Sequence, residues 1–148
     1  MPGKFEQFKS KVKELVTERR QFPRREAKLV VKLPVGVSVP NENIDPEAEH
    51  YPLPIMGLTR DVSESGLSVI VPTLQLGDEE IAPRGYPLRL VLSLPHDLII
   101  VQSQTVRSDV IEKADGAPSY LLGLSITRIG DRDRAKYLKF LQQTASSA

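Results

Sequence analysis

The sequence contains no cysteine, and this absence removes three kinds of chemistry at once. The chain has no disulfide, no thiolate ligand for a metal and no thiol nucleophile. Disulfides accumulate in oxidising compartments and are rare in the cytosol, so a chain without cysteine fits a reducing compartment. We therefore expect a cytoplasmic protein.

Long apolar runs are also missing. No segment approaches the roughly 20 apolar residues that a membrane-spanning helix needs. A secretory signal requires an uninterrupted apolar core, and Glu6, Lys9, Lys11 and Lys13 interrupt the N-terminal stretch. We therefore expect neither a transmembrane segment nor a signal peptide.

Patterns typical of enzymes are equally scarce. The two histidines, His50 in a proline-rich stretch and His96 in a predicted turn, are interpreted as exposed structural residues. The sequence has no metal-ligand spacing, no G-x-S-x-G nucleophile motif and no G-x-x-x-x-G-K-S/T phosphate loop. Acidic residues are the only candidate bases near Ser63. We expect a binding protein that is not an enzyme and has no cofactor and no metal.

The net charge of +1 conceals two segments of opposite sign. Residues 1–32 carry ten Lys and Arg against four Glu, a balance of +6, whereas residues 41–80 carry nine Asp and Glu against one Arg, a balance of −8. The basic segment either pairs with the acidic one in the fold or is reserved for an anionic ligand.

Residues 4–18 predict an amphipathic helix, which we treat as an extension of its own. Its apolar positions recur with a helical period and lysines and glutamates cover the other face; they are Phe5, Phe8, Val12, Leu15 and Val16. The apolar stripe packs on the chain's own core, or docks on a second copy or another protein. A third interpretation places this basic helix on an anionic membrane surface.

The rest of the chain predicts a mainly β domain. At 148 residues with 40% apolar content the chain suits one domain with additions. Two-residue alternation and turn residues predict strands, which we place at 27–39, 55–61, 67–71, 88–94, 98–107 and 120–127. Pro34 and Gly36 predict an edge, bend or bulge in the first of them. These strands are expected to form an antiparallel sheet closed into a barrel or sandwich.

Loops and a last helix complete this division. Prolines and acidic residues predict loops at 40–54 and 72–86. Asp131 is a suitable cap for a helix over 132–143. We expect a domain over 19–143, followed by a frayed tail over 144–148.

The densest charge in the chain lies in Arg19-Arg20-Gln21-Phe22-Pro23-Arg24-Arg25, four guanidinium groups within seven residues. A guanidinium group binds phosphate oxygens or guanine acceptors through two parallel hydrogen bonds, and its flat face stacks on a base. Proline disfavours a helix at Phe22, so this arm is expected to be extended or turned. It predicts a site for an anion.

A second stretch, Asp61-Val62-Ser63-Glu64-Ser65-Gly66, supplies acceptors at the end of a predicted strand. Asp61 and Ser63 share a face if the strand geometry continues. A carboxylate accepts hydrogen bonds from the N1–H and N2 amine of guanine, and a hydroxyl donates or accepts. Gly66 allows the backbone to turn or to approach a neighbour closely.

Taken in order, Arg20-x-x-x-Arg24 and Asp61-x-Ser63-x-x-Gly66 resemble the two motifs of the PilZ domain family, RxxxR and D/N-x-S-x-x-G. Arg19, Phe22-Pro23 and Leu122-Gly123-Leu124 are also similar to that family. The resemblance covers about residues 19–141. It implies an antiparallel β-barrel of about six strands, a C-terminal helix and binding of the second messenger cyclic di-GMP.

The resemblance also implies the roles of individual residues. Arg20 and Arg24 would hold guanine and phosphate groups from a flexible arm, with Arg19 beside them. Asp61 and Ser63 would contact a guanine from the barrel surface, and Gly66 would keep the turn; Gly123 belongs to the same expected ligand set. The long loop at 40–54 and the helix at 4–18 depart from the family pattern.

The leading hypothesis is a bacterial cyclic di-GMP receptor in which the ligand orders the arginine arm and so repositions the helix at 4–18. The alternative is a PilZ-like scaffold that binds a protein partner and no nucleotide. Specific nucleic-acid binding is disfavoured, because aromatics are 5% of the chain and the acidic middle repels a polyanion.

Overall fold

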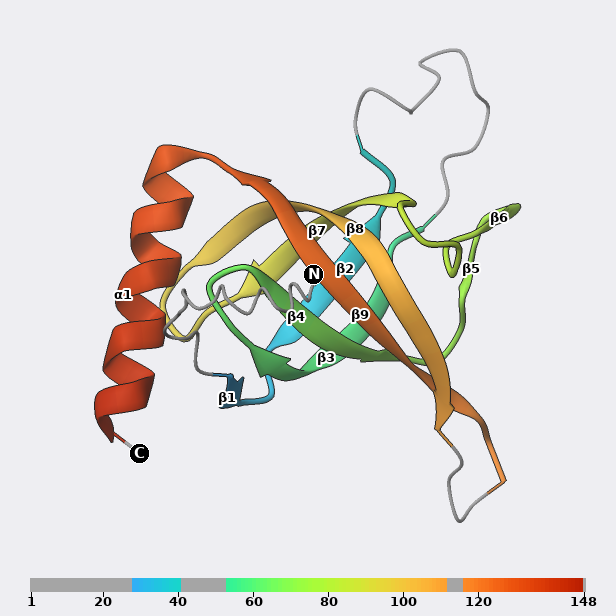
Figure 1. Ribbon diagram of the computed structural model, residues 1–148, viewed down its shortest axis with the longest axis horizontal. Helices are drawn as coiled ribbons and strands as arrows, with labels where there is room; N and C mark the ends of the chain where they lie inside the picture. The colour runs from blue at the N-terminus through green and yellow to red at the C-terminus, as the bar shows by residue number, and fades with distance from the viewer. Residues whose placement is uncertain (1–27, 41–52, 112–115, 148) are drawn as a thin grey trace, which may run out of the picture.

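The computed structural model describes residues 28–40, 53–111 and 116–147 and is shown in Figure 1. The helix expected at 4–18 and the arginine arm (residues 19–25) lie outside these residues. The described residues form a closed β-barrel with one helix against it.

Six antiparallel strands of this part of the chain build the barrel. They are β2 (Pro34–Ser38), β3 (Ile55–Val62), β4 (Gly66–Val71), β7 (Pro87–Ser93), β8 (Leu98–Ile111) and β9 (Ser119–Ile129). They follow one another in the order β3-β2-β7-β8-β9-β4, and β4 pairs back with β3. That last pairing closes the sheet and confirms the expected six-stranded antiparallel barrel.

Three smaller elements and a helix surround the barrel. Strand β1 (Leu29–Val30) pairs with the end of β3, and β5 (Gln75–Leu76) and β6 (Glu79–Glu80) form a separate small hairpin. Helix α1 (Asp131–Ser147) follows β9 directly and lies beside the barrel (Figure 1).

Alternation along the strands fills the barrel interior with aliphatic side chains. The fully buried ones come from every barrel strand: Val35 and Val37, Val62, Val69, Leu88, Leu90 and Leu92, Ile99 and Val101, and Leu122. Helix α1 adds Tyr137, which is buried, and Phe140 and Leu141, which are half-buried against the same core. Apolar area removed from water contributes about 25 cal/mol per Å² to the free energy of folding. Burial of these side chains therefore stabilises the barrel.

Several segments differ from the sequence-based expectation. The loop predicted over 72–86 contains the β5–β6 hairpin, and the strand predicted over 98–107 continues to Ile111. The strand predicted over 27–39 is divided into β1 and β2, because the backbone around Leu33 bonds to Thr59 rather than continuing one ladder. The helix predicted over 132–143 continues to Ser147, so the frayed tail expected at 144–148 is wrong for residues 144–147. No glycine or proline interrupts those residues.

Thr59 joins the two halves of that divided strand. Its side chain is 1% exposed, accepts a hydrogen bond from the backbone N–H of Leu33 at 2.8 Å and donates one to the carbonyl of Val31. Thr59→Val leaves both groups without this partner, so we expect a loss of about 1–3 kcal/mol in the free energy of unfolding, measured in urea. Thr127→Val, at an exposed threonine of β9, is the control. Equal unfolding midpoints for the two variants would contradict this role.

Candidate functional site

One shallow cavity on the outer wall brings together the described part of the predicted site. Asp61, Ser63, Gly66 and Gly123 all line it, and its volume is about 250 Å³. Arg19, Arg20 and Arg24 lie outside the described residues. The structure thus gathers on one wall four residues that are up to 62 positions apart in the sequence.

Strand register creates this arrangement. Asp61 on β3 is paired with Ser68 on β4, Ser68 with Gly123 on β9, and Gly123 with Arg107 on β8. These four residues therefore form a continuous line across four neighbouring strands, called the cross-strand row below. Neighbouring strands are about 4.8 Å apart, so the row spans roughly 14 Å of the wall.

A β-bulge sets the direction of the side chain at each end of the cross-strand row. The register shifts between Thr59 and Asp61 on β3 and between Thr105 and Arg107 on β8. Thr59 and Thr105 are each 1% exposed and face the interior. Strict two-residue alternation would turn Asp61 and Arg107 inward as well, whereas one extra residue turns them outward. The bulges therefore put a carboxylate and a guanidinium group on the same face.

Residues 63–66, the motif turn, are held by their own hydrogen bonds. The Ser63 backbone N–H donates to the Gly66 carbonyl at 2.8 Å, and the Ser63 hydroxyl donates to the same carbonyl at 3.1 Å. Ser63 is 7% exposed. In this conformation the Ser63 hydroxyl hydrogen forms a hydrogen bond within the turn. Contact between Ser63 and a ligand stays a prediction.

Gly66 is required by close packing. A Cβ atom at Gly66 would lie 2.5 Å from the carbonyl oxygen of Leu124 in the adjacent strand. Gly66 is not among the described glycines with positive φ, which are Gly77, Gly85 and Gly116. The glycine of the motif therefore permits close approach of β4 to β9.

A buried tyrosine connects the motif turn to helix α1. The Tyr137 hydroxyl donates to the Ser63 carbonyl at 2.6 Å, and Tyr137 is 1% exposed. Because Tyr137 is also part of the core, the turn is anchored from beneath by the helix.

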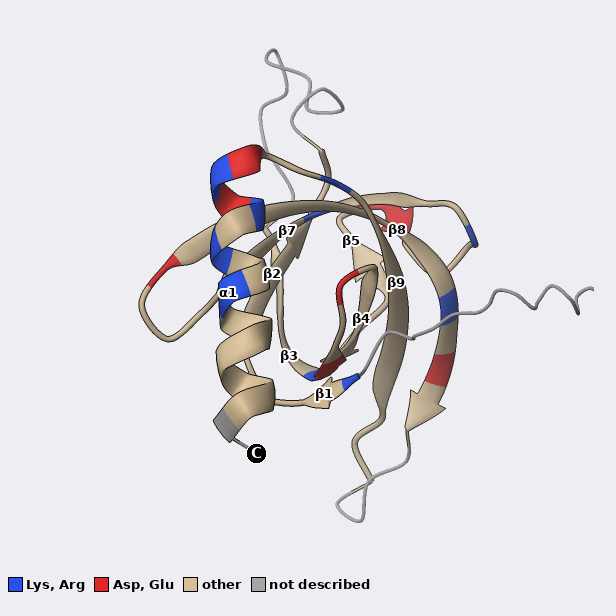
Figure 2. Ribbon diagram, turned by 60° about the vertical axis from the view of Figure 1, so that its left-hand side comes forward, with Lys and Arg blue, Asp and Glu red and all other residues tan. Residues whose placement is uncertain are grey.

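The charges around the cavity favour an anion. Lys28 and Arg107 are the basic lining residues among those described, and Asp61 is the acidic one. Asp61 pairs only loosely with its neighbour, since Arg60 Nε and Asp61 Oδ2 are 3.8 Å apart and the Arg60 side chain is 56% exposed. Such pairs contribute little, so the carboxylate keeps its capacity to accept hydrogen bonds. Figure 2 shows basic and acidic positions close together where β1 runs beside β3.

Sequence reasoning missed Lys28 and Arg107. Lys28 is the first described residue and stands apart from the arginine-rich stretch. Val101, Ser103 and Thr105 are every second residue of β8 and face the interior. The same two-residue alternation predicts an interior position for Arg107. The sequence signal for Arg107 was its charge, because a cation buried in the barrel interior would be costly.

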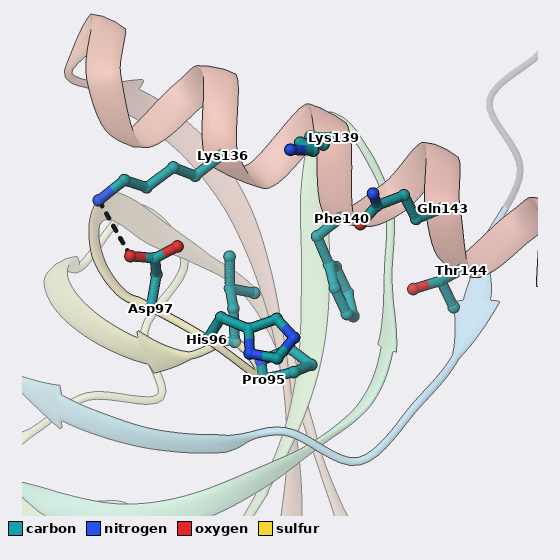
Figure 3. Close-up of a pocket in the computed structure, with 9 residues that line it drawn as sticks. Pro95, His96, Asp97, Lys136, Lys139, Phe140, Gln143 and Thr144 are labelled. Carbon is teal, nitrogen blue, oxygen red and sulfur yellow. Dashed lines mark ion pairs between the residues drawn. The ribbon is translucent and has the colours of Figure 1, made fainter.

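A second groove lies between the β7–β8 turn and helix α1 (Figure 3). Its volume is about 520 Å³, and Lys136 Nζ pairs with Asp97 Oδ1 across it at 3.3 Å. Phe140 points into it from the helix. None of the predicted ligand residues that the structure describes lines this groove.

Metal-binding clusters and membrane-spanning helices are absent from the described residues. These residues contain no group of three or more His, Asp or Glu arranged to hold a metal ion. Among the same residues, no helix has both the length and the apolar character needed to cross a membrane.

Comparison with known proteins places these observations in a family. The family model of the PilZ domain matches residues 18–143. No curated protein matches the chain in a sequence comparison. The PilZ domain of YcgR from Escherichia coli, solved with c-di-GMP, has a TM-score of 0.58 at 7% identity, over 85% of this chain and 94% of that one.

Two longer proteins share the fold. The MrkH–c-di-GMP complex of K. pneumonia has a TM-score of 0.60 at 14% identity, over 86% of this chain and 54% of MrkH. The Bacillus subtilis inhibitor of motility MotI/DgrA has a TM-score of 0.56 at 18% identity, over 88% of this chain and 55% of MotI/DgrA. The chain therefore spans about half the length of these two proteins.

Proposed function

The chain belongs to the PilZ domain family, and on that premise we propose that it is a bacterial, cytoplasmic receptor for cyclic di-GMP. The observation that carries the proposal is the cross-strand arrangement of Asp61 with the motif turn and two basic side chains around one cavity. Two proteins with this fold, the PilZ domain of YcgR and MrkH, have been solved with c-di-GMP.

Each part of the proposed site matches one part of the ligand. The Asp61 carboxylate accepts from guanine N1–H and N2, while Arg20 and Arg24, with Arg19 beside them, hold guanine and phosphate acceptors through paired hydrogen bonds. The described cavity, at about 250 Å³, is below the 300–1,000 Å³ of pockets that enclose drug-sized ligands. The wall therefore supplies one side of the site, and the arm supplies the other.

Chain length allows the arm to reach the wall. Lys28 lines the cavity, and Arg24 precedes it by only four residues. An extended chain spans at most about 3.6 Å per residue, so the Arg24 backbone is within roughly 14 Å of the Lys28 backbone. The arm is therefore short enough and close enough for Arg24 to reach the cavity that Asp61 lines.

Signalling follows from ordering of this arm. The phosphates of the ligand offset the mutual repulsion of the arginines, and the arm then settles against the wall. The arm follows residues 4–18 directly in the sequence. A change in the position of the arm therefore changes what the apolar stripe of residues 4–18 contacts. The ligand shifts this equilibrium by its differential affinity for the two arrangements.

Isothermal titration calorimetry tests the assignment. We expect the wild-type chain to bind cyclic di-GMP with micromolar or better affinity, and Arg20→Ala, Arg24→Ala and Asp61→Ala each to lose about tenfold or more, because each removes a charge-assisted hydrogen bond. Arg128→Ala, at an exposed arginine of β9 that does not line the cavity, is the control. Unchanged affinity in both arm variants would reject the assignment.

A protein-binding scaffold without nucleotide is the second candidate. It is favoured by exposed apolar side chains on the outer face of β3, where Met56 is 62% and Leu58 45% exposed. Apolar area of this kind marks protein contacts when it is contiguous. A folded, monodisperse chain that gives no heat with cyclic di-GMP, yet retains a protein partner through residues 4–18, would favour this candidate.

A further inference from the structure

The Arg107 side chain lies along the barrel wall over Gly123. A Cβ atom at Gly123 would be 3.0 Å from Arg107 Cγ and 3.2 Å from Arg107 Nε. Gly123 is buried and Arg107 is exposed, so the arginine side chain covers the glycine and is accessible to solvent. Only glycine at position 123 leaves room for the Arg107 side chain to lie in this direction.

The fold places Arg107 here through a specific irregularity. The interior residues Val101, Ser103 and Thr105 are at most 2% exposed, and Arg107 would be next in the alternation. The β8 bulge turns it outward and opposite Gly123, as the β3 bulge turns Asp61 outward at the other end of the cross-strand row. Bulges are over-represented beside functional sites, where they re-aim a side chain.

We infer that Arg107 is a ligand-contacting residue, a phosphate-binding guanidinium on the rigid barrel wall, and that Gly123 is a positioning residue that gives Arg107 its path. This inference rests on the proposed function. It reassigns Gly123, which the resemblance puts in the ligand set, from contact with the ligand to support of its neighbour.

The separation of the two charges specifies which part of the ligand each one meets. Arg107 reaches back over Gly123, which is two strands from Asp61, a distance of roughly 10 Å. Asp61 accepts from the base edge, so a cation two strands away meets the sugar–phosphate end of the same nucleotide. A guanidinium group binds such phosphate oxygens in a paired geometry. Lys28, the other cation among the described residues that line the cavity, adds attraction without that geometry.

A double-mutant cycle in the full chain, titrated with cyclic di-GMP, tests the inference. We expect Arg107→Ala to weaken binding about 10- to 100-fold, the effect of losing a hydrogen bond to a charged group. Gly123→Ala is expected to weaken binding in the wild-type background and to have no further effect in the Arg107→Ala background, because the side chain that it displaces is then gone. Arg128→Ala again controls for loss of charge.

The salt dependence of binding gives a second measurement. Loss of a phosphate contact lowers the slope of log affinity against log salt, so Arg107→Ala is expected to show a shallower slope than Arg128→Ala. Thermal unfolding of each variant confirms that the barrel is folded in the titration.

The outcomes separate this inference from the proposed function. Wild-type binding with unchanged affinity in Arg107→Ala overturns the inference and leaves the receptor assignment standing. A further loss from Gly123→Ala in the Arg107→Ala background overturns the positioning role, because Gly123 would then meet the ligand itself. Absence of wild-type binding rejects the receptor function, and the inference fails with it.

Discussion

Replacing Gly66 with alanine is expected to lower the free energy of unfolding by about 1–3 kcal/mol or more, in the range of overpacked sites. The new methyl group would lie 2.5 Å from the Leu124 carbonyl oxygen, a backbone atom of β9. Gly66 is paired with Ser125 on that strand, so β4 and β9 must separate to admit the methyl group. The same movement displaces the motif turn, and ligand affinity is expected to fall with stability.

Gly130→Ala is the matched control for this experiment. A Cβ atom at Gly130 meets nothing within 4 Å, and Gly130 is not among the described glycines with positive φ. The Gly130 carbonyl accepts the Arg134 N–H at the start of α1, a position where alanine is less favourable than glycine. This cost opposes the gain of up to about 1 kcal/mol from the unfolded chain, so we expect stability to change by no more than about 1 kcal/mol. Urea denaturation of the two variants makes the comparison, and similar midpoints would show that the β4–β9 approach at Gly66 tolerates a side chain.

The fold was largely predictable because its strands alternate cleanly. Leu88, Leu90 and Leu92 point inward from β7 and are fully buried, as their two-residue period predicts. Pro34 and Gly36 indicated an irregularity in this stretch, but periodicity did not locate the break between β1 and β2, because its position depends on the Thr59 side chain from another strand. A long-range hydrogen bond of this kind leaves no local pattern.

The candidate site was predictable only where a motif marks it. Asp61, Ser63 and Gly66 were found together because they are close in the sequence, and the structure places them at one cavity. Arg107 was missed because alternation assigns it to the interior, and its true direction depends on a bulge. Motifs record positions along the chain, whereas register and bulges decide which distant residues join them.

Tyr137 carries the second large expected effect, because it combines core packing with the hydrogen bond to the motif turn. Its hydroxyl donates to the Ser63 carbonyl at 2.6 Å in a buried setting. Tyr137→Phe leaves that carbonyl without this donor, and we expect a loss of about 1–3 kcal/mol. Tyr137→Ala also removes the ring from the core, and a loss of about 3–5 kcal/mol is expected, as for other large aromatic truncations.

A chemically identical change elsewhere isolates the role of burial. The Tyr86 hydroxyl donates to Glu79 Oε1 at 3.0 Å in an exposed setting, so Tyr86→Phe is expected to change stability by no more than about 0.5 kcal/mol. Amide hydrogen exchange should also be faster across residues 63–66 in Tyr137→Phe and unchanged there in Tyr86→Phe. If both variants unfold at the same urea concentration and exchange alike, helix α1 does not hold the motif turn. If they differ as expected, movement of the turn on ligand binding is transmitted to the helix through the buried hydrogen bond between Tyr137 and Ser63, which are 74 positions apart.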